Sequence, residues 1–551
     1  MGLVNILSSI SVTSFGEGFG AATISYKWIY DFISWLVSFG GDLGLGIILF
    51  TLALKLVTLP LDIISRASMK KNSLKMELMK DDLEKLQKQY ANNKELYQQK
   101  MMALYKKNGY SAFSACLPTI ITLVFFFIVL AGFQSFSRYE NKQVFNEMGK
   151  AYSVKVEEIA NSGALVKKDE KTYELNINAA LKAKGVEGLF DGYGEAANTD
   201  TDNYTLNVSS VMGDNDKIVA LGLQSYFVNG DYNYDNTDLR SNINLDAHDY
   251  LVKAAFLSDA ALENSLKERG IISLSGEKYV INDFNSFYEA VKTYENVAKY
   301  LVNTSTGEEV SYAINFKALL GDNAELKADF EKKAEDTVTK AAIETVSEEF
   351  IKDYVKTPAR HAAKDAYYEY RSHSVITPWI NNLWAVDSPF SKAIPTYSEF
   401  KTQMQSKAEN IGSLEEADYN EITYELEDLK QTGFGKGNGY FILVAISILA
   451  MLGSTLVTQK MQKTQMQLST VDGANGQTAT TQKMMTWMMP AMFGIFAFMY
   501  SAAFSMYMIT STLLSTGSTM LINFFVEKSF KKKLENEEAD KANQRRYGKR
   551  R

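Results

Sequence analysis

The stretch GLGIILFTLALKLVTLPLDII at residues 44–64 decides the fold class of this 551-residue chain. As an α-helix it is about 30 Å long, which is the thickness of the hydrocarbon core of a bilayer. Lys55 lies near its middle and Pro60 near one end. The stretch therefore predicts a membrane-spanning helix that carries a charge at a depth where lipid tolerates charge poorly.

Further apolar stretches predict an α-helical polytopic membrane protein with five spans. The expected spans are 41–64, 117–137, 439–458, 484–503 and 505–526. Residues 26–40, with Trp28 and Trp35, predict an amphipathic helix that lies in the membrane interface or begins the first span. The remaining parts are an N-terminal segment (1–25), a charged segment (65–108), an acidic segment (138–435), a polar loop (459–483) and a basic tail (527–551).

Charge is distributed unevenly along the chain and predicts its orientation. Residues 65–108 hold 11 basic and 5 acidic side chains, and residues 528–551 hold 10 basic and 4 acidic ones. Residues 138–435, in contrast, hold 31 basic and 50 acidic side chains. Short positive segments remain in the cytoplasm. We therefore expect a multi-pass plasma-membrane protein with segments 65–108 and 459–483 and the C-terminus in the cytoplasm. The acidic segment is expected to form a mixed α/β extracellular domain, in which no internal repeat is evident.

The residue types argue against most classes of enzyme. Cys116 is the single cysteine, so an internal disulfide and a thiolate metal cage are excluded. The three histidines lack the i,i+4 partner of a metalloprotease helix, and no phosphate-binding glycine motif is found. We expect no catalytic residue, no metal, no cofactor and no ATP hydrolysis.

Lys55 suggests a polar surface inside the membrane. Thr51, Lys55 and Thr58 are spaced i, i+4 and i+7, so they share one helix face. Lys55 is about 10 Å from either end of the span, beyond the comfortable reach of a lysine that snorkels to the interface. We favour a water-filled cavity open to the cytoplasm. Snorkelling or a carboxylate partner is the alternative, although the other four expected spans contain no acidic residue.

Hydroxyl side chains are concentrated in the later spans. Nine of the 19 residues from 501 to 519 are Ser or Thr. The candidate groove residues on the third and fifth spans are Ser454, Thr455, Ser505, Thr512 and Thr516. Helix packing through small residues, or hydroxyls bonded to carbonyls of their own helix, is the alternative interpretation.

The charged segment 65–108 predicts a helical hairpin. Its helical periodicity is interrupted by a turn at Ala91-Asn92-Asn93. Met76, Met79, Leu83 and Leu86 are placed at heptad-like spacing on the first helix. Two amphipathic helices that face each other are the expected result.

This order of features resembles the YidC family of membrane protein insertases. The matching strings are GLGIILFTLALKLVTLPLD (44–62), LMKDDLEKLQKQYANNKELYQQKMMALYKKNGYSAFSACLPTIIT (78–122) and QKMMTWMMPAMFGIFAFMYSAAFSMYMITSTLLS (482–515). The resemblance covers 26–137 and 437–530. Departures are the 298-residue acidic insert and Thr122 and Val124, where the family often has Gln and Pro.

The resemblance implies a five-helix insertase core with a hydrophilic groove open to cytoplasm and lipid. It places the positive charge of the groove on Lys55, where the family most often has arginine. It makes the hairpin the part that receives substrates, with Met76, Met79, Leu83 and Leu86 as its candidate residues.

The functional hypothesis is a membrane protein insertase and chaperone that acts without ATP. The expected partners are nascent membrane proteins, the Sec translocon, a ribosome at the basic tail and anionic lipid, but not DNA. Two other functions stay open. One is a multi-span transporter or channel, and the other is a surface binding protein that acts through 138–435.

Overall fold

The computed structural model of the chain describes residues 11–15, 26–109, 113–194, 196–305, 310–405, 414–461, 488, 491 and 495–548. Contacts divide the chain into two compact units. The core unit comprises residues 17–151 and 360–551, and the insert unit comprises 1–16 and 152–359. The expected segment 138–435 is therefore not one unit, because both of its ends pack with the core unit.

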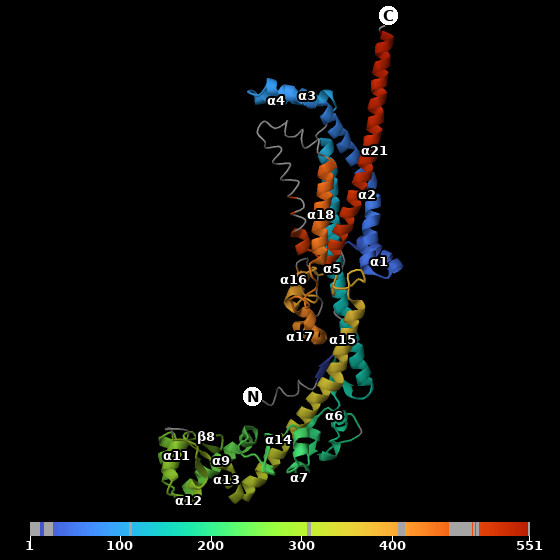
Figure 1. Cartoon of the computed structure of the whole chain (residues 1–551). Helices are drawn as coiled ribbons and strands as arrows, with labels where there is room; N and C mark the ends of the chain where they lie inside the picture. The colour runs from blue at the N-terminus through green and yellow to red at the C-terminus, as the bar shows by residue number, and fades with distance from the viewer. Residues whose placement is uncertain are drawn as a thin grey trace. The chain divides into compact units, whose positions relative to one another are not determined.

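The core unit is built of helices. Their bounds are α1 (Lys27–Gly40), α2 (Leu43–Leu78), α3 (Lys80–Gln89), α4 (Lys94–Lys107), α5 (Phe113–Asn161), α15 (Thr357–Tyr370), α16 (Tyr397–Gln405), α17 (Glu416–Ile422), α18 (Ile442–Met461) and α21 (Ala502–Gly548). The long helices α2, α5, α18 and α21 run beside one another (Figure 1). α21 packs against both α2 and α18.

Several expected boundaries are wrong because helices continue past the apolar stretches. α2 runs on to Leu78 with Pro60 inside it, so the first part of segment 65–108 extends the spanning helix. Within segment 65–108, α3 and α4 pack against each other as two short helices. α5 continues beyond residue 137 to Asn161, and α21 continues beyond residue 526 to Gly548.

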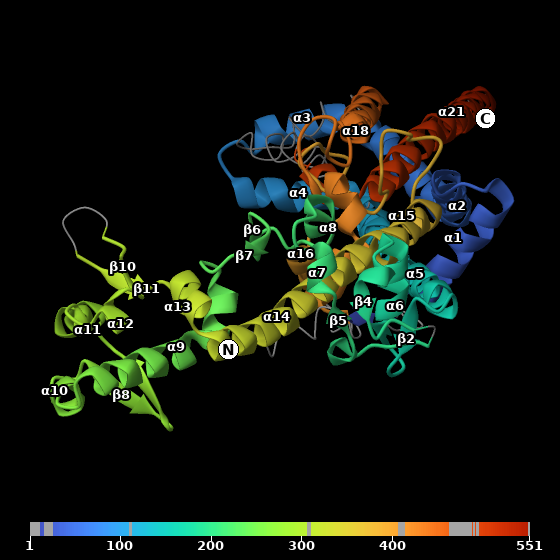
Figure 2. The same cartoon turned by 90° about the horizontal axis from the view of Figure 1, so that it is seen from below.

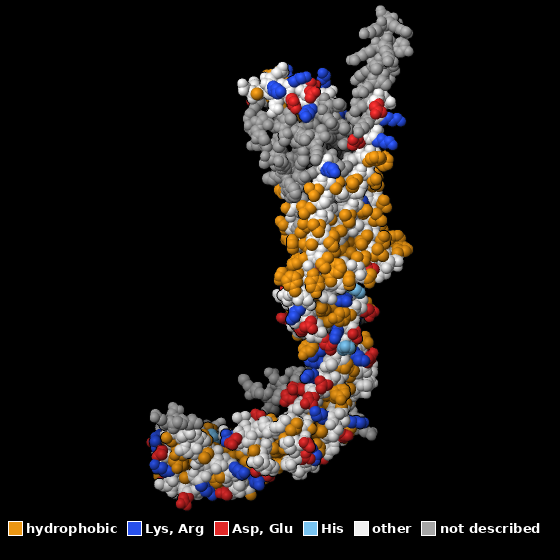
Figure 3. Space-filling view, viewed as in Figure 1, with side chains coloured by type: hydrophobic (Ala, Val, Ile, Leu, Met, Phe, Trp, Pro, Cys, Tyr) orange, Lys and Arg blue, Asp and Glu red, His pale blue; other side chains and the backbone are white. Residues whose placement is uncertain are grey.

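The outer surface of the long helices is apolar. Figure 3 shows hydrophobic side chains gathered over this part of the core unit, with few charged side chains among them. Exposed apolar residues of α2, α18 and α21 include Leu56, Val57, Ile64, Leu449, Leu456, Leu521, Phe524 and Phe525. Leu43–Ile64 and Ala502–Ser529 are long and apolar enough to cross a membrane, and Ile442–Thr458 is a shorter apolar helix.

Three expected parts fall largely outside the described residues. The fourth span (484–503) is described at 488, 491 and 495–503, the loop 459–483 at 459–461, and the N-terminal segment 1–25 at 11–15. The count of five spans stays a prediction.

Helix α1 is amphipathic, as predicted. Ile29 and Ile33 are fully buried in the core, whereas Trp28 and Trp35 are each more than half exposed. At Gly132 of α5 a Cβ atom would lie only 2.1 Å from the Ile29 side chain. The close approach of α5 to α1 therefore requires glycine at that position.

Two carboxylates form hydrogen bonds that join the segment between α15 and α18 to the starts of the membrane helices α2 and α18. Asp42, just before α2, accepts a hydrogen bond from the Ser374 hydroxyl at 2.8 Å. Asp387 is buried and accepts one from the amide of Leu443 at 2.6 Å, in the first turn of α18. A carboxylate satisfies the free N–H groups of a helix start and complements its dipole. These bonds explain why this segment belongs to the core unit.

The insert unit mixes α and β structure. Its elements are β1 (Ser11–Thr13), β2 (Leu165–Lys167), β3 (Thr172–Leu175), α6 (Ile177–Lys184), β4 (Phe190–Asp191), β5 (Thr205–Leu206), α7 (Val208–Val211), α8 (Asn215–Ala220), β6 (Phe227–Val228), β7 (Asp231–Tyr232), α9 (Thr237–Ser258), α10 (Leu262–Glu268), β8 (Ile272–Ser275), β9 (Lys278–Ile281), α11 (Phe284–Val291), α12 (Glu295–Ala298), β10 (Leu301–Asn303), β11 (Tyr312–Ile314), α13 (Phe316–Asp322) and α14 (Ala324–Phe350). α9 and α14 pack against each other, and short hairpins lie along them (Figure 2).

The insert unit contains an internal repeat, so the expectation of none is wrong. Five antiparallel hairpins follow one another in the chain, and each is followed by a helix. The repeated units are β2–β3–α6, β4–β5–α7, β6–β7–α9, β8–β9–α11 and β10–β11–α13. Four of them share the sequence Tyr-x-(Leu/Ile)-Asn, at 173–176, 204–207, 279–282 and 312–315.

Two positions of the shared sequence have a structural reason. The aliphatic third residue is buried in all four units: Leu175, Leu206, Ile281 and Ile314. The Asn at the fourth position caps the following helix in two of the units, at Asn207 and Asn315, and the neighbouring Asp283 does so in a third. Such a cap stabilises a helix by about 1 kcal/mol. The signature therefore marks a turn from a strand into a helix.

Strand β1 completes the first of these units. Val12 pairs with Tyr173 of β3 and is 1% exposed. The amide of Phe15 donates a hydrogen bond to Ser153 Oγ at 2.7 Å, and its ring lies 5.0 Å from that of Tyr152. Residues 11–15 are thus part of the folded insert unit.

Helix side chains close the corresponding edges in two other units. The amide of Leu206 in β5 donates to Thr339 Oγ1 of α14 at 2.9 Å. The amide of Ile281 in β9 donates to His248 Nδ1 of α9 at 3.1 Å. Strand β1 therefore provides hydrogen-bond partners for the edge of β3, whereas side chains of α14 and α9 do so for β5 and β9.

Val12→Asp should destabilise the insert unit by about 2–4 kcal/mol, because it puts an unpaired carboxylate into a buried position. Thr13→Asp is the matched control, because Thr13 is exposed on the same strand. Denaturant-dependent proteolysis of the full chain, read by peptides from 152–359, measures the effect. Equal stability of the two variants would show that β1 is not packed there.

Candidate functional site

One face of α2 carries the polar residues of the first span. Thr51 is buried, and Lys55, Thr58 and Asp62 are half-buried. The opposite face, which includes Val57, is exposed and apolar. The predicted sharing of one face by Thr51, Lys55 and Thr58 is confirmed.

Lys55 has a carboxylate partner, which corrects the favoured prediction of an unpaired ammonium group. Its Nζ forms an ion pair with Asp62, two turns further along the same helix. The two side chains are 16% and 15% exposed. A pair of opposite charges is much less costly to place inside a protein than one charge alone. The sequence argument missed Asp62 because it sought acidic residues only in the other four spans.

Helices α18 and α21 meet through hydroxyl side chains. The Thr516 hydroxyl donates to Ser454 Oγ at 2.8 Å, which joins two of the candidate groove residues. The hydroxyl of Ser505 is buried and has no hydrogen-bond partner among the described residues. Close contact through small hydroxyl residues is typical of helix pairs in membranes.

Other candidate hydroxyls bond to their own helix. Thr51 Oγ1 donates to the carbonyl of Ile47 at 2.7 Å, and Thr58 Oγ1 to that of Lys55 at 3.3 Å. The alternative reading from sequence therefore accounts for these two threonines. Thr455 and Thr512 are half-buried. A role of any of these residues in a groove stays a prediction.

The hairpin α3–α4 is closed by its own apolar residues. Met79 and Leu83 are buried and pack against Met101 and Leu104 of α4. Leu86 is half-buried, and the side chain of Met76 lies outside the described residues. A substrate could reach Met79 and Leu83 only if α4 moved. Their role in receiving substrates stays a prediction.

A buried carboxyl group lies on α5 beyond the expected second span. Glu140 accepts a hydrogen bond from the Ser372 hydroxyl at 3.2 Å. Burial raises the pKa of Glu140 to about 7, and the hydrogen bond from Ser372 acts against this rise. The sequence carries no signal of this burial, because charged neighbours at 138 and 142 suggest an exposed helix.

A family model described as 60Kd inner membrane protein matches residues 35–168 and 372–529, just over half of the chain. The first matched segment ends at residue 168, beyond the expected 137, and the second begins at residue 372, before the expected 437. Residues 169–371, most of the insert unit, lie outside the match.

Several curated proteins named membrane protein insertase YidC are similar to parts of the chain. The protein of Clostridium perfringens is 38% identical over 107 residues, which are 19% of this chain and 43% of the relative. YidC 1 of Streptococcus pyogenes is 36% identical over 133 residues, 22% of this chain and 46% of the relative. The protein of Fusobacterium nucleatum is 29% identical over 114 residues, which are 20% of this chain and 54% of the relative. The alignments thus span about half of these relatives or less. No solved structure matches the chain.

Lys55→Met should lower the free energy of unfolding by about 3–5 kcal/mol, because it leaves Asp62 unpaired inside the protein. The double variant Lys55→Met with Asp62→Leu should recover most of that loss, because apolar residues of similar size replace the whole pair. Thermal unfolding in lipid nanodiscs measures both. A double variant as unstable as the single one would contradict the pairing, and Val57→Met on the exposed face is the control.

Glu140→Gln should change how stability depends on pH. A folded-state pKa raised from 4.5 to about 7 means that the folded protein keeps this proton longer than the unfolded chain. The stability gained below pH 4.5 is therefore lost as pH rises to 7, by roughly 3 kcal/mol. The variant should lack this loss and exceed the unmodified protein in unfolding temperature at pH 8. Glu157→Gln, on the exposed part of α5, should keep the original profile.

Proposed function

The chain belongs to the family of the 60Kd inner membrane protein, and on that basis we propose that it is a membrane protein insertase. Its substrates are nascent membrane proteins, as the names of its relatives suggest. The observation that carries the proposal is the match of the family to the two segments that make up most of the core unit.

The proposed working surface is the polar face of α2 together with the hydroxyl residues of α18 and α21. A substrate has a short polar flank that must cross the hydrocarbon, where each unsatisfied polar group costs several kcal/mol. Support comes from the ion pair of Lys55 with Asp62 and from half-buried hydroxyls such as Thr516. These groups offer both donors and acceptors at membrane depth.

The ion pair changes the proposed role of Lys55. A free ammonium group would attract acidic residues of the flank, whereas a paired one offers a local dipole. We therefore assign hydration of the flank to the pair as a whole. The apolar helix of the substrate then moves into lipid, and burial of its surface drives the step without ATP.

Orientation and partners complete the proposal. The hairpin α3–α4 and the basic tail (527–551) lie in the cytoplasm, where the tail meets anionic lipid or a ribosome. The insert unit lies outside the cell. The Sec translocon is a further proposed partner.

A transporter is the second candidate, and one observation favours it. Paired charges inside the membrane are common in transporters, and Lys55 and Asp62 form such a pair. The names of the relatives favour the insertase. The two functions differ in whether a substrate protein becomes embedded in lipid.

Insertion into proteoliposomes with the purified full chain tests the function. The substrate is a single-span protein with a short acidic outer flank, added after synthesis and after removal of nucleotides. The pair-free variant Lys55→Met with Asp62→Leu should insert it at least about tenfold more slowly, which corresponds to about 1.4 kcal/mol of barrier. The reversed pair, Lys55→Asp with Asp62→Lys, should retain insertion because it keeps a local dipole, although the direction of that dipole is reversed.

Three outcomes would contradict parts of the proposal. Unchanged insertion by the pair-free variant would remove the role of the pair. Loss of insertion by the reversed pair, if that variant unfolds normally, would restore the role of a positive charge at position 55. Failure of the unmodified protein without nucleotides would refute the ATP-independent mechanism. Val57→Met should behave as the unmodified protein.

A further inference from the structure

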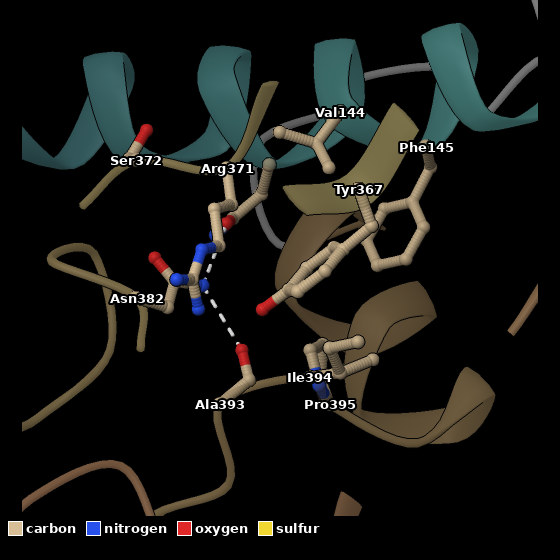
Figure 4. Close-up of a pocket in the computed structure, with 10 residues that line it drawn as sticks. Val144, Phe145, Tyr367, Arg371, Ser372, Asn382, Ala393, Ile394 and Pro395 are labelled. Atoms are coloured by element: carbon tan, nitrogen blue, oxygen red, sulfur yellow. Dashed lines mark hydrogen bonds between the residues drawn. The ribbon is translucent and has the colours of Figure 1, made fainter. Parts of the chain in front are cut away.

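A small pocket lies in the core unit where α5, the end of α15 and the segment 382–395 meet (Figure 4). Asn141 and Phe145 line it from α5, Tyr367 and Arg371 from α15 and its end, and Asn382 and Ile394 from the segment. Its volume of about 10 Å³ is the space for a single particle of the size of water.

Two hydrogen-bond donors in this pocket have no acceptor. Tyr367 is 3% exposed, and its hydroxyl has no hydrogen-bond partner among the described residues. The same is true of the buried Nε of Arg371. Figure 4 shows the Tyr367 hydroxyl directed toward the guanidinium group of Arg371. Burial raises the pKa of Tyr367, so the hydroxyl keeps its proton and can donate it to a ligand in the pocket.

The neighbouring polar groups are already engaged. Asn382 Nδ2 donates to Asn141 Oδ1 at 3.2 Å and to the carbonyl of Ala393 at 3.0 Å. Ser372 Oγ accepts from the indole N–H of Trp384 at 2.7 Å and donates to Glu140. These bonds leave the two donors facing each other across the pocket.

The charge of Arg371 also lacks a counter-charge. Its recorded partners are Asn381 Oδ1, 3.1 Å from Nη1, and the ring of Tyr368, 4.8 Å from Cζ. Both partners are neutral, and no ion pair to Arg371 occurs in the described part of the chain. Arg371 is half-buried, with its Nε atom inside, so an anion beside that atom would be attracted to the charge. A water molecule would accept both hydrogen bonds, but it would leave the charge uncompensated and add two protons of its own.

We propose that this pocket binds one monovalent anion of halide size, held by Arg371 Nε and the Tyr367 hydroxyl. The volume excludes carboxylates, phosphate and sulfate. The bound anion joins α15 to α5 at a point that no protein side chain fills. This site is independent of the proposed insertase activity.

Anion exchange at constant ionic strength tests the site. The full-length protein in nanodiscs is unfolded thermally while chloride or bromide replaces gluconate, which is too large for the pocket. The unfolding temperature should rise and saturate with either halide. Tyr367→Phe should weaken the apparent halide affinity at least tenfold, because it removes one hydrogen bond to a charged acceptor. Tyr368→Phe is the matched control and should keep the affinity, because Tyr368 does not line the pocket.

The remaining results decide against the site. Equal unfolding temperatures in gluconate and halide would mean that water alone fills the pocket. An equal halide response of Tyr367→Phe and the unmodified protein would mean non-specific stabilisation. In bromide-soaked crystals an anomalous peak between Arg371 and Tyr367 would support the proposal, and its absence at saturating bromide would overturn it. Arg371→Gln should abolish the response, but Tyr367→Phe is decisive because it preserves the bond to Asn381.

Discussion

Every polar group that α2 carries at membrane depth must find its partner inside the protein, because hydrocarbon supplies neither water nor counter-ions. The helix meets this requirement locally. The carboxylate of Asp62 neutralises Lys55 two turns away, and Thr51 bonds to the carbonyl of Ile47 in the preceding turn. The polar face can therefore exist without a partner helix to neutralise it. The neighbouring helix α21 contributes hydroxyl groups, which form hydrogen bonds with α18. These bonds place no further charge inside the membrane.

The sequence predicted the core unit well where a pattern has a local cause. The shared face of Thr51, Lys55 and Thr58 and the buried face of α1 follow from helical spacing alone. The partner of Lys55 was equally local, since Asp62 lies at i+7. It was missed because a partner was sought only in the other four spans and not on the same helix. The apolar length of a stretch did not predict the helix ends, because α2, α5 and α21 continue beyond their apolar stretches.

The insert unit was much harder to predict. Its signature has only four residues and recurs after 31, 75 and 33 residues, so local periodicity does not reveal it. Its hairpins have strands of two to four residues, too short for alternation to be recognised. Long-range contacts decide their burial, such as the bond from Leu206 to Thr339. The burial of Tyr367 and Glu140 likewise depends on residues far away in the chain, and no local pattern encodes it.

The pairing of β1 with β3 has a consequence for the order of events during synthesis. About 160 residues separate the two strands, including all of α2 and α5. At about 5–20 residues per second, the ribosome needs roughly 8–30 s to make them. Val12 and Phe15 thus remain without their docking surface while the first membrane helix is already complete. Closure of this sheet is therefore a late step of folding, because a contact between residues so far apart in the chain forms only after the second partner is made.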